Sequence, residues 1–152
     1  GGVMSAGPER LWAAAQAGIP TVLAPGCVDM CNFWGMDSIP EKYHSRNLYK
    51  WNPNVTLMRT TVEENVRIGE LIAAAANAAT GPVAILLPHK GVSQLDSPGG
   101  MFWDPAADGA CYDTIKAMAK PGVQVIDLDL NINDPEFADK AVEVLLTMVK
   151  KA

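Results

Sequence analysis

The stretch Val83-Ala84-Ile85-Leu86-Leu87 is apolar at every position and is bounded by Gly81-Pro82 and by Pro88. A strand with this pattern is buried on both faces, which is typical of the centre of a parallel sheet covered by helices. We therefore predict that residues 83–87 form the central strand of such a sheet.

Apolar patterns on either side of this strand predict strands and helices in alternation. The expected strands are residues 21–24, 55–58 and 123–130, the last an edge strand because polar residues alternate along it. The expected helices are residues 8–17, 62–80, 105–118 and 135–149. This order predicts an α/β fold: an open, mostly parallel sheet with helices packed on it in a Rossmann-like three-layer arrangement.

Capping residues mark the helix starts. Thr61 and Glu64 form a capping-box pattern, and Asp104 and Asp134 each precede a proline suited to a first helical turn, as Pro8 is in the first helix. Helical spacing predicts two buried stripes, one of Ile68, Leu71, Ile72, Ala75 and Ala79, the other of Ala138, Ala141, Val142, Leu145 and Val149.

Composition excludes several classes of protein. The 152 residues are 49% hydrophobic and 19% charged, which fits one globular domain spanning 1–152. Twelve Lys and Arg against seventeen Asp and Glu give a net charge of −5, which opposes binding to nucleic acid. No apolar run reaches the roughly 20 residues of a membrane helix. Three cysteines, an odd number, favour reduced thiols and a cytoplasmic location.

Ligands of open α/β sheets bind beyond the carboxyl ends of the strands, where the polar loops of this chain are expected to gather. The opening loop is one candidate, because its glycines let amides approach an anion at a helix start; its predicted ligand residues are Gly1, Gly2, Ser5, Ala6 and Gly7. A tight turn without a ligand is the alternative. No strand precedes this loop, so we expect a further, amino-terminal domain before it.

Two other loops carry candidate ligand residues. Arg59, Thr60 and Thr61 place a guanidinium and two hydroxyls beside a helix start, where an anion is favoured; alternatively, Thr61 only caps the helix and Arg59 pairs with Glu63 or Glu64. The loop after the central strand offers Lys90, Gly91, Ser93, Gly99 and Gly100 for a phosphate, or is simply solvated.

Asp29 and His89 are the candidates for proton transfer. Asp29 and His89, with Cys27, Cys31 and His44, are residue types that bind metals. The spacing of the two cysteines is wider than in the CxxC motif of a metal site, however. We predict no metal. The long irregular stretch 27–54 predicts a functional loop or an interface. Phe33-Trp34 and Met101-Phe102-Trp103 are bulky residues in loops, suited to a subunit interface, a stacked ring or a lid.

Four motifs carry a family resemblance. They are residues 1–11 (GGVMSAGPERL), residues 52–61 (NPNVTLMRTT) with Glu63-Glu64-Asn65, Gly91-Val92-Ser93 with Asp96, Pro98-Gly99-Gly100 and Asp104-Pro105, and residues 131–135 (NINDP). Together they resemble the carboxyl-terminal domain of an uncharacterised protein family that includes the tomato mosaic virus resistance protein. The resemblance implies longer members with an amino-terminal α/β domain, ATP binding, homodimers, and, for the plant member, inhibition of a viral replication protein. It implies no agreed reaction and no catalytic residues.

The leading hypothesis is therefore an α/β domain that binds a nucleotide or another small phosphate ligand, with ATP as a possible cofactor, through loops at the carboxyl ends of the strands. One alternative is a dimerisation or interaction module without catalysis. The other is a small-molecule enzyme in which His89 or Asp29 transfers a proton.

Overall fold

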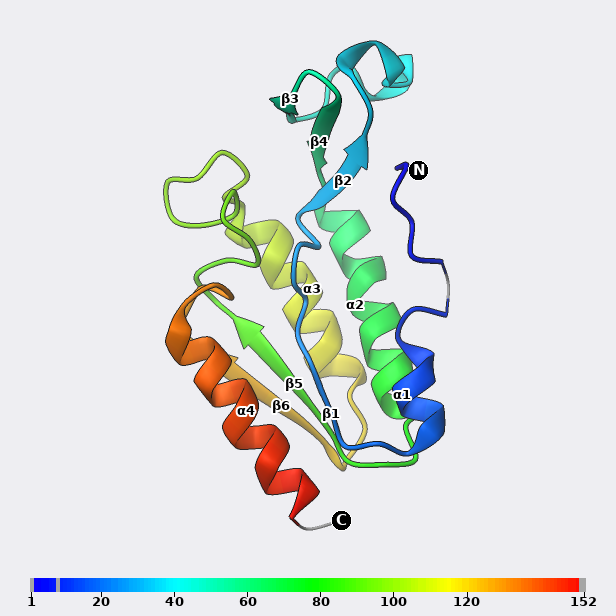
Figure 1. The fold of residues 1–152 in the computed structure, drawn as a ribbon, viewed down its shortest axis with the longest axis vertical. Helices are drawn as coiled ribbons and strands as arrows, with labels where there is room; N and C mark the ends of the chain where they lie inside the picture. Colours follow the sequence, from blue (N-terminus) through cyan, green and yellow to red (C-terminus); the bar gives the residue numbers. More distant parts are fainter. Residues whose placement is uncertain (1, 8, 151–152) are drawn as a thin grey trace.

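The computed structural model of the chain describes residues 2–7 and 9–150, and it contains two small sheets (Figure 1). The first is parallel, with strand order β1-β5-β6, and consists of β1 (Thr21–Leu23), β5 (Val83–Pro88) and β6 (Val123–Leu128). The second is antiparallel, with order β2-β4-β3, and consists of β2 (Met30–Phe33), β3 (Leu48–Asn52) and β4 (Val55–Arg59). Two predicted residues lie outside the described part of the chain: Gly1, which we expected to bind an anion, and Pro8, which we expected in the first turn of a helix.

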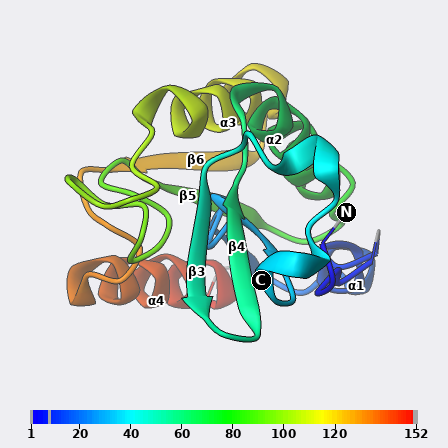
Figure 2. The ribbon, with the colours of Figure 1, turned by 90° about the horizontal axis from the view of Figure 1, so that it is seen from above.

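In the part of the chain that the structure describes, four α-helices accompany the sheets: α1 (Trp12–Ala17), α2 (Val62–Asn77), α3 (Pro105–Met118) and α4 (Pro135–Val149). Helices α2 and α3 cover one face of the parallel sheet and α4 covers the other (Figure 2). The predicted α/β fold with helices packed on a parallel sheet is confirmed.

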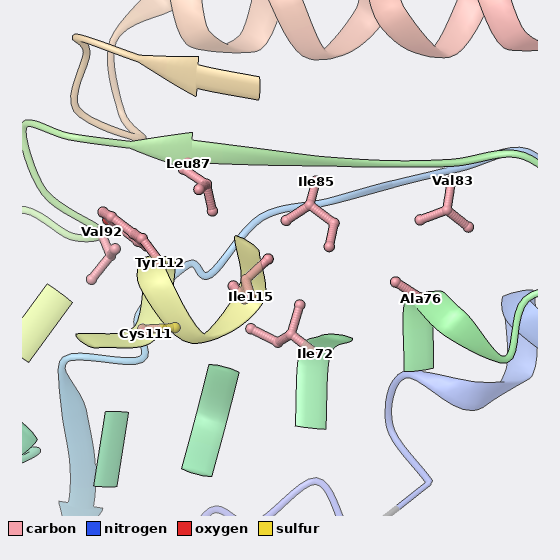
Figure 3. Close-up of a cluster of buried hydrophobic side chains, with 9 residues drawn as sticks. All are labelled: Ile72, Ala76, Val83, Ile85, Leu87, Val92, Cys111, Tyr112 and Ile115. Atoms are coloured by element: carbon pink, nitrogen blue, oxygen red, sulfur yellow. The ribbon is translucent and has the colours of Figure 1, made fainter. Parts of the chain in front are cut away.

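The central strand β5 contributes side chains to the hydrophobic core on both faces of the parallel sheet. All six of its residues are buried, as the unbroken apolar run predicts. Successive side chains of a strand point to opposite faces, so Ile85 and Leu87 pack against Ile72 and Ile115 of α2 and α3 (Figure 3). Their neighbours Ala84 and Leu86 pack against Phe137, Val144 and Met148 of α4 on the other face.

The helix starts follow the capping patterns closely. Thr61 accepts a hydrogen bond from the Glu64 amide while the Glu64 carboxylate accepts one from the Thr61 amide, a complete capping box. Asp104 accepts from the Ala107 amide at the start of α3. Asp134 differs, because its carboxylate accepts from the Asn131 amide instead of capping α4.

The antiparallel sheet is the main correction to the predicted fold. Residues 55–58 do form a strand, but β4 pairs with β2 and β3 and not with the parallel sheet. The stretch 27–54, predicted as irregular, contains β2, β3 and two short 3-10 turns, Met36–Ser38 and Glu41–Tyr43. Around these turns lies a separate small core of Phe33, Ile39 and Met58.

Four residues predicted to face the core are exposed, namely Leu71, Ala138, Val142 and Val149. On α4 the buried positions are instead Phe137, Val144 and Met148, because the helix is rotated relative to the stripe that the spacing indicated. Within the described residues, no helix combines the length and the apolar character needed to cross a bilayer.

Candidate ligand-binding site

A pocket of about 580 Å³ lies at the carboxyl edge of the parallel sheet, below the antiparallel sheet. Three loops reach it, one from the end of each parallel strand, and strands β2, β3 and β4 close it from above. We call it the edge pocket. Its lining residues are Gly26, Cys27, Met30, Asn32, Trp51, Asn52, Val55, Leu57, Val92, Ser93, Gln94, Leu95, Ile132 and Asn133.

The lining of the edge pocket is apolar with uncharged polar groups. Among the described residues, no Lys, Arg, Asp, Glu or His lines it. Its polar side chains are chiefly the carboxamides of Asn32, Asn52, Gln94 and Asn133. Partial burial and, secondarily, the charge of Asp29 raise the pKa of the Cys27 thiol above its ordinary value.

Asn131 fixes the wall formed by the loops after β5 and β6. Its Nδ2 donates to the carbonyls of Lys90, Ser93 and Asp96 at 2.9, 3.1 and 3.3 Å. Its Oδ1 accepts from the amide of Asn133, a lining residue. One buried side chain therefore positions both loops.

Ser93 connects the pocket with the buried carboxylates behind it. Its hydroxyl donates to Asp29 Oδ2 at 2.8 Å and accepts from the amides of Leu95 and Asp96. Asp29 is fully buried, and its Oδ1 has no hydrogen-bond partner among the described residues. Burial, reinforced by the charge of Asp96, raises the pKa of Asp29, although the Ser93 hydrogen bond acts in the opposite direction. Asp29 therefore lies behind the pocket wall, out of reach of a ligand.

Arg59 is engaged by the protein itself and does not line the edge pocket. Its side chain is 4% exposed. Its guanidinium donates to Asp108 Oδ1 at 2.7 Å and to Asp96 Oδ1 at 3.4 Å. It also donates to the Phe102 carbonyl and the Thr60 hydroxyl. This arginine joins β4 to the loop after β5 and to α3.

Thr60 and Thr61 also serve the fold. The Thr60 hydroxyl donates to the Val28 carbonyl and accepts from Asn65 Nδ2. Thr61 caps α2, as the alternative interpretation held, but Glu64 pairs with Arg46 at 2.6 Å and not with Arg59.

His89 and Lys90 are exposed and turn toward the end of β6. His89 Nε2 lies 2.5 Å from Asp127 Oδ1, and Lys90 Nζ lies 2.9 Å from Asp129 Oδ2. Neither residue lines the edge pocket.

The opening loop runs beside β2. The Val3 amide donates to the Asn32 carbonyl, and Gly2 lies so close to β2 that an added Cβ would be 2.5 Å from Cys31 Sγ. The Ser5 hydroxyl accepts from the Gly7 amide. Gly2, Ser5, Ala6 and Gly7 do not line the edge pocket.

The loop after β5 folds back on itself. Gly91 adopts φ +111°, and Gly100 packs against the Leu95 carbonyl, whereas Gly99 faces open space. Of the predicted ligand residues within the described chain, Ser93 alone lines the edge pocket.

Sequence reasoning found the edge of the sheet where the pocket lies, but it missed the residues that characterise it. Asn52 and Asn133 belong to the motifs NPN and NIN, which entered the sequence analysis only as part of the family resemblance. Trp51 is not among the predicted ligand residues. The described residues contain no group of three or more His, Cys, Asp or Glu side chains placed to hold a metal ion.

Comparison with known proteins gives a match over residues 1–149 to the family described as "Uncharacterised protein family (UPF0261) C-terminal domain". A UPF0261 protein of Clostridium tetani is 46% identical over 152 residues, covering 99% of this chain and 38% of that protein. One of Rhizobium meliloti is 46% identical, covering 93% of this chain and 36% of that protein. The ToMV resistance protein Tm-1(GCR237) of Solanum lycopersicum is 38% identical, covering 100% of this chain and 20% of that protein. The chain thus spans well under half of these relatives.

Proposed function

The chain belongs to the uncharacterised protein family UPF0261, matching its C-terminal domain, and from this premise we propose that it binds a nucleotide or a related phosphate-bearing small molecule in the edge pocket. The observation that carries the proposal is the position of the pocket: loops from all three parallel strands meet there. Ligands of open α/β sheets bind at this edge, in pockets of about 300–1,000 Å³. The volume of about 580 Å³ lies within this range.

The phosphate is expected to face solvent. No cationic side chain among the described residues lines the pocket, so a phosphate placed deep inside would lose its hydration without a charged partner. ATP is the first ligand to test, because the family resemblance implies ATP binding.

We expect ATP to bind saturably and Trp51→Ala to weaken that binding about tenfold or more, because an indole stacked on a base contributes roughly 1–3 kcal/mol. The measurement is isothermal titration calorimetry on this chain and on a full-length family protein. Trp34→Ala is the matched control, because Trp34 is 53% exposed and Trp51 54% exposed, but Trp34 lies outside the pocket. Absence of saturable binding to both proteins, or equal loss in both variants, would contradict the proposal.

A small-molecule enzyme is the weaker candidate for this pocket. His89 does not line it, and the carboxyl of Asp29 is fully buried behind Ser93. We place the protein in the cytoplasm on the strength of its free thiols at Cys27, Cys31 and Cys111.

We propose in addition that two copies of the chain associate through α4. Val142, Leu146 and Val149 are exposed and lie on one face of this helix, where a monomer gains nothing from apolar side chains. Among the bulky loop residues that we assigned to an interface, Phe33 and Phe102 are buried, whereas Trp34 and Met101 are exposed.

Leu146→Glu is expected to convert a dimer into a monomer in sedimentation velocity, because it would bury a carboxylate in the apolar interface. Lys140→Glu, also on α4, controls for the added negative charge. A wild-type chain that sediments as a monomer, or a Leu146→Glu dimer of unchanged stability, would overturn this assignment.

A further inference from the structure

We infer that the edge pocket recognises the uncharged part of its ligand, the base and sugar of a nucleoside, and leaves the phosphate in solvent. This inference rests on the proposed function and specifies which half of a nucleotide the pocket selects. Three features support it. The lining carries carboxamides with unused hydrogen-bonding groups, it includes an aromatic wall, and Arg59 and Lys90 are paired with carboxylates of the protein.

The carboxamides offer both hydrogen-bond donors and acceptors to a ligand. Asn52 Oδ1 accepts from the Asn54 amide, which leaves its Nδ2 without an acceptor among the described residues. Asn133 Nδ2 donates to Asn131 Oδ1, which leaves its Oδ1 available. Neither Gln94 nor Asn32 makes a side-chain hydrogen bond within the described chain, so all four carboxamides retain unused capacity. Nucleobase edges and sugar hydroxyls alternate donors and acceptors in the same way.

Trp51 supplies a flat wall at the same pocket, and its ring packs against that of Tyr49. The ring of Tyr49 meets it edge-on at 6.2 Å, and Tyr49 in turn meets the buried ring of Phe102 at 6.4 Å. An aromatic ring that is held in place loses little freedom when a planar heterocycle stacks on it. The remaining walls, among them Val92 and Ile132, are aliphatic and suit the faces of a ring.

The two cationic residues predicted to bind a phosphate, Arg59 and Lys90, are paired within the protein. Arg59 is held by Asp96 and Asp108, and Lys90 pairs with Asp129. The chain as a whole carries a net charge of −5. A triphosphate therefore finds no cationic partner in the pocket, and the net negative charge of the chain weakly repels it. An uncharged nucleoside needs no such partner and is not repelled.

The test is a calorimetric titration of the protein with adenosine, guanosine, ATP, ribose 5-phosphate and tripolyphosphate at low and moderate salt. We expect the dissociation constants of ATP and of the better-bound nucleoside to agree within about threefold. Ribose 5-phosphate and tripolyphosphate, which lack a base, should bind at least about tenfold more weakly. The nucleoside affinity should change less than about twofold with salt, because no ion pair forms.

Asn52→Ala and Asn133→Ala should each weaken nucleoside and ATP binding by similar factors, about five- to tenfold, the loss of one buried hydrogen bond. Gln124→Ala is the control, an exposed carboxamide on β6 outside the pocket. If tripolyphosphate or ribose 5-phosphate binds as tightly as ATP while the nucleosides do not bind, or if the asparagine variants bind normally, the inference fails and the proposed function stands. If no probe binds at all, both fail.

Discussion

Replacing Arg59 with methionine is expected to lower the free energy of unfolding by about 3–5 kcal/mol, because removing one member of a buried ion network leaves its partners uncompensated. The side chains of Arg59, Asp96 and Asp108 are at most 5% exposed. Methionine has a similar length and fills much of the same space, so the expected loss arises from charge and hydrogen bonding more than from a cavity. Chemical denaturation in urea measures it.

The destabilisation caused by Arg59→Met should also depend on pH, and the protonation of Asp108 determines whether it grows or shrinks as the pH rises. Burial, together with the charge of Asp96, raises the pKa of Asp108 to about 7 in the folded protein, from an ordinary value of 3.8. The stability associated with its proton is therefore complete below about pH 4 and is lost as the pH rises through about 7. Arg59 opposes this loss by favouring the carboxylate, so the Arg59→Met deficit should be larger at about pH 8 than at about pH 5.

Arg46→Met provides the matched control. Arg46 also pairs with a carboxylate, at 2.6 Å from Glu64, but Glu64 is 41% exposed and water can replace the lost partner. We expect a loss of about 1 kcal/mol or less, with little change between these pH values. Similar losses for Arg46→Met and Arg59→Met, or a pH dependence of the opposite sign, would show that the buried network does not stabilise the fold as argued.

Arg59 also illustrates what the sequence alone can and cannot reveal. Its position at a strand end beside a helix start is visible locally, and it fits an anion site. Its partners Asp96 and Asp108 lie 37 and 49 residues further along the chain. Only the folded chain brings these carboxylates to the guanidinium, so local chemistry could not distinguish an anion site from a buried ion network.

The fold was predictable where burial imposes a simple pattern. The uninterrupted apolar run of β5 identifies the centre of the parallel sheet, and the Thr61–Glu64 capping box identifies the start of α2. Strand β3 carries no such pattern, because Lys50, Trp51 and Asn52 are all exposed and its pairing with β4 depends on contacts made after the chain has folded. The edge pocket is a similar case. Its location follows from the topology, but the sequence does not indicate whether an asparagine at a strand end or in a turn faces a ligand.

The glycine that sets the pocket wall should tolerate substitution least. Gly91→Ala is expected to lower the free energy of unfolding by about 4 kcal/mol or more, or to prevent folding. Gly91 adopts φ +111°, and an added Cβ would lie 1.7 Å from the Asp96 carbonyl oxygen and 2.9 Å from Asn131 Nδ2. Relieving a clash with backbone requires the loop after β5 to move, and this movement breaks the hydrogen bonds that Asn131 makes to that loop.

Gly122→Ala separates this steric contribution from the cost of the backbone conformation. Gly122 has nearly the same φ, +106°, but its added Cβ would meet no heavy atom within 4 Å. Its expected loss is about 1–2 kcal/mol, the cost of a left-handed conformation alone. The difference between the two variants therefore measures how rigidly Asn131 and the Asp96 carbonyl hold the wall of the edge pocket. If Gly91→Ala were no more destabilising than Gly122→Ala, the loop would be free to shift, and a pocket bounded by so mobile a wall could not hold a nucleoside in one orientation.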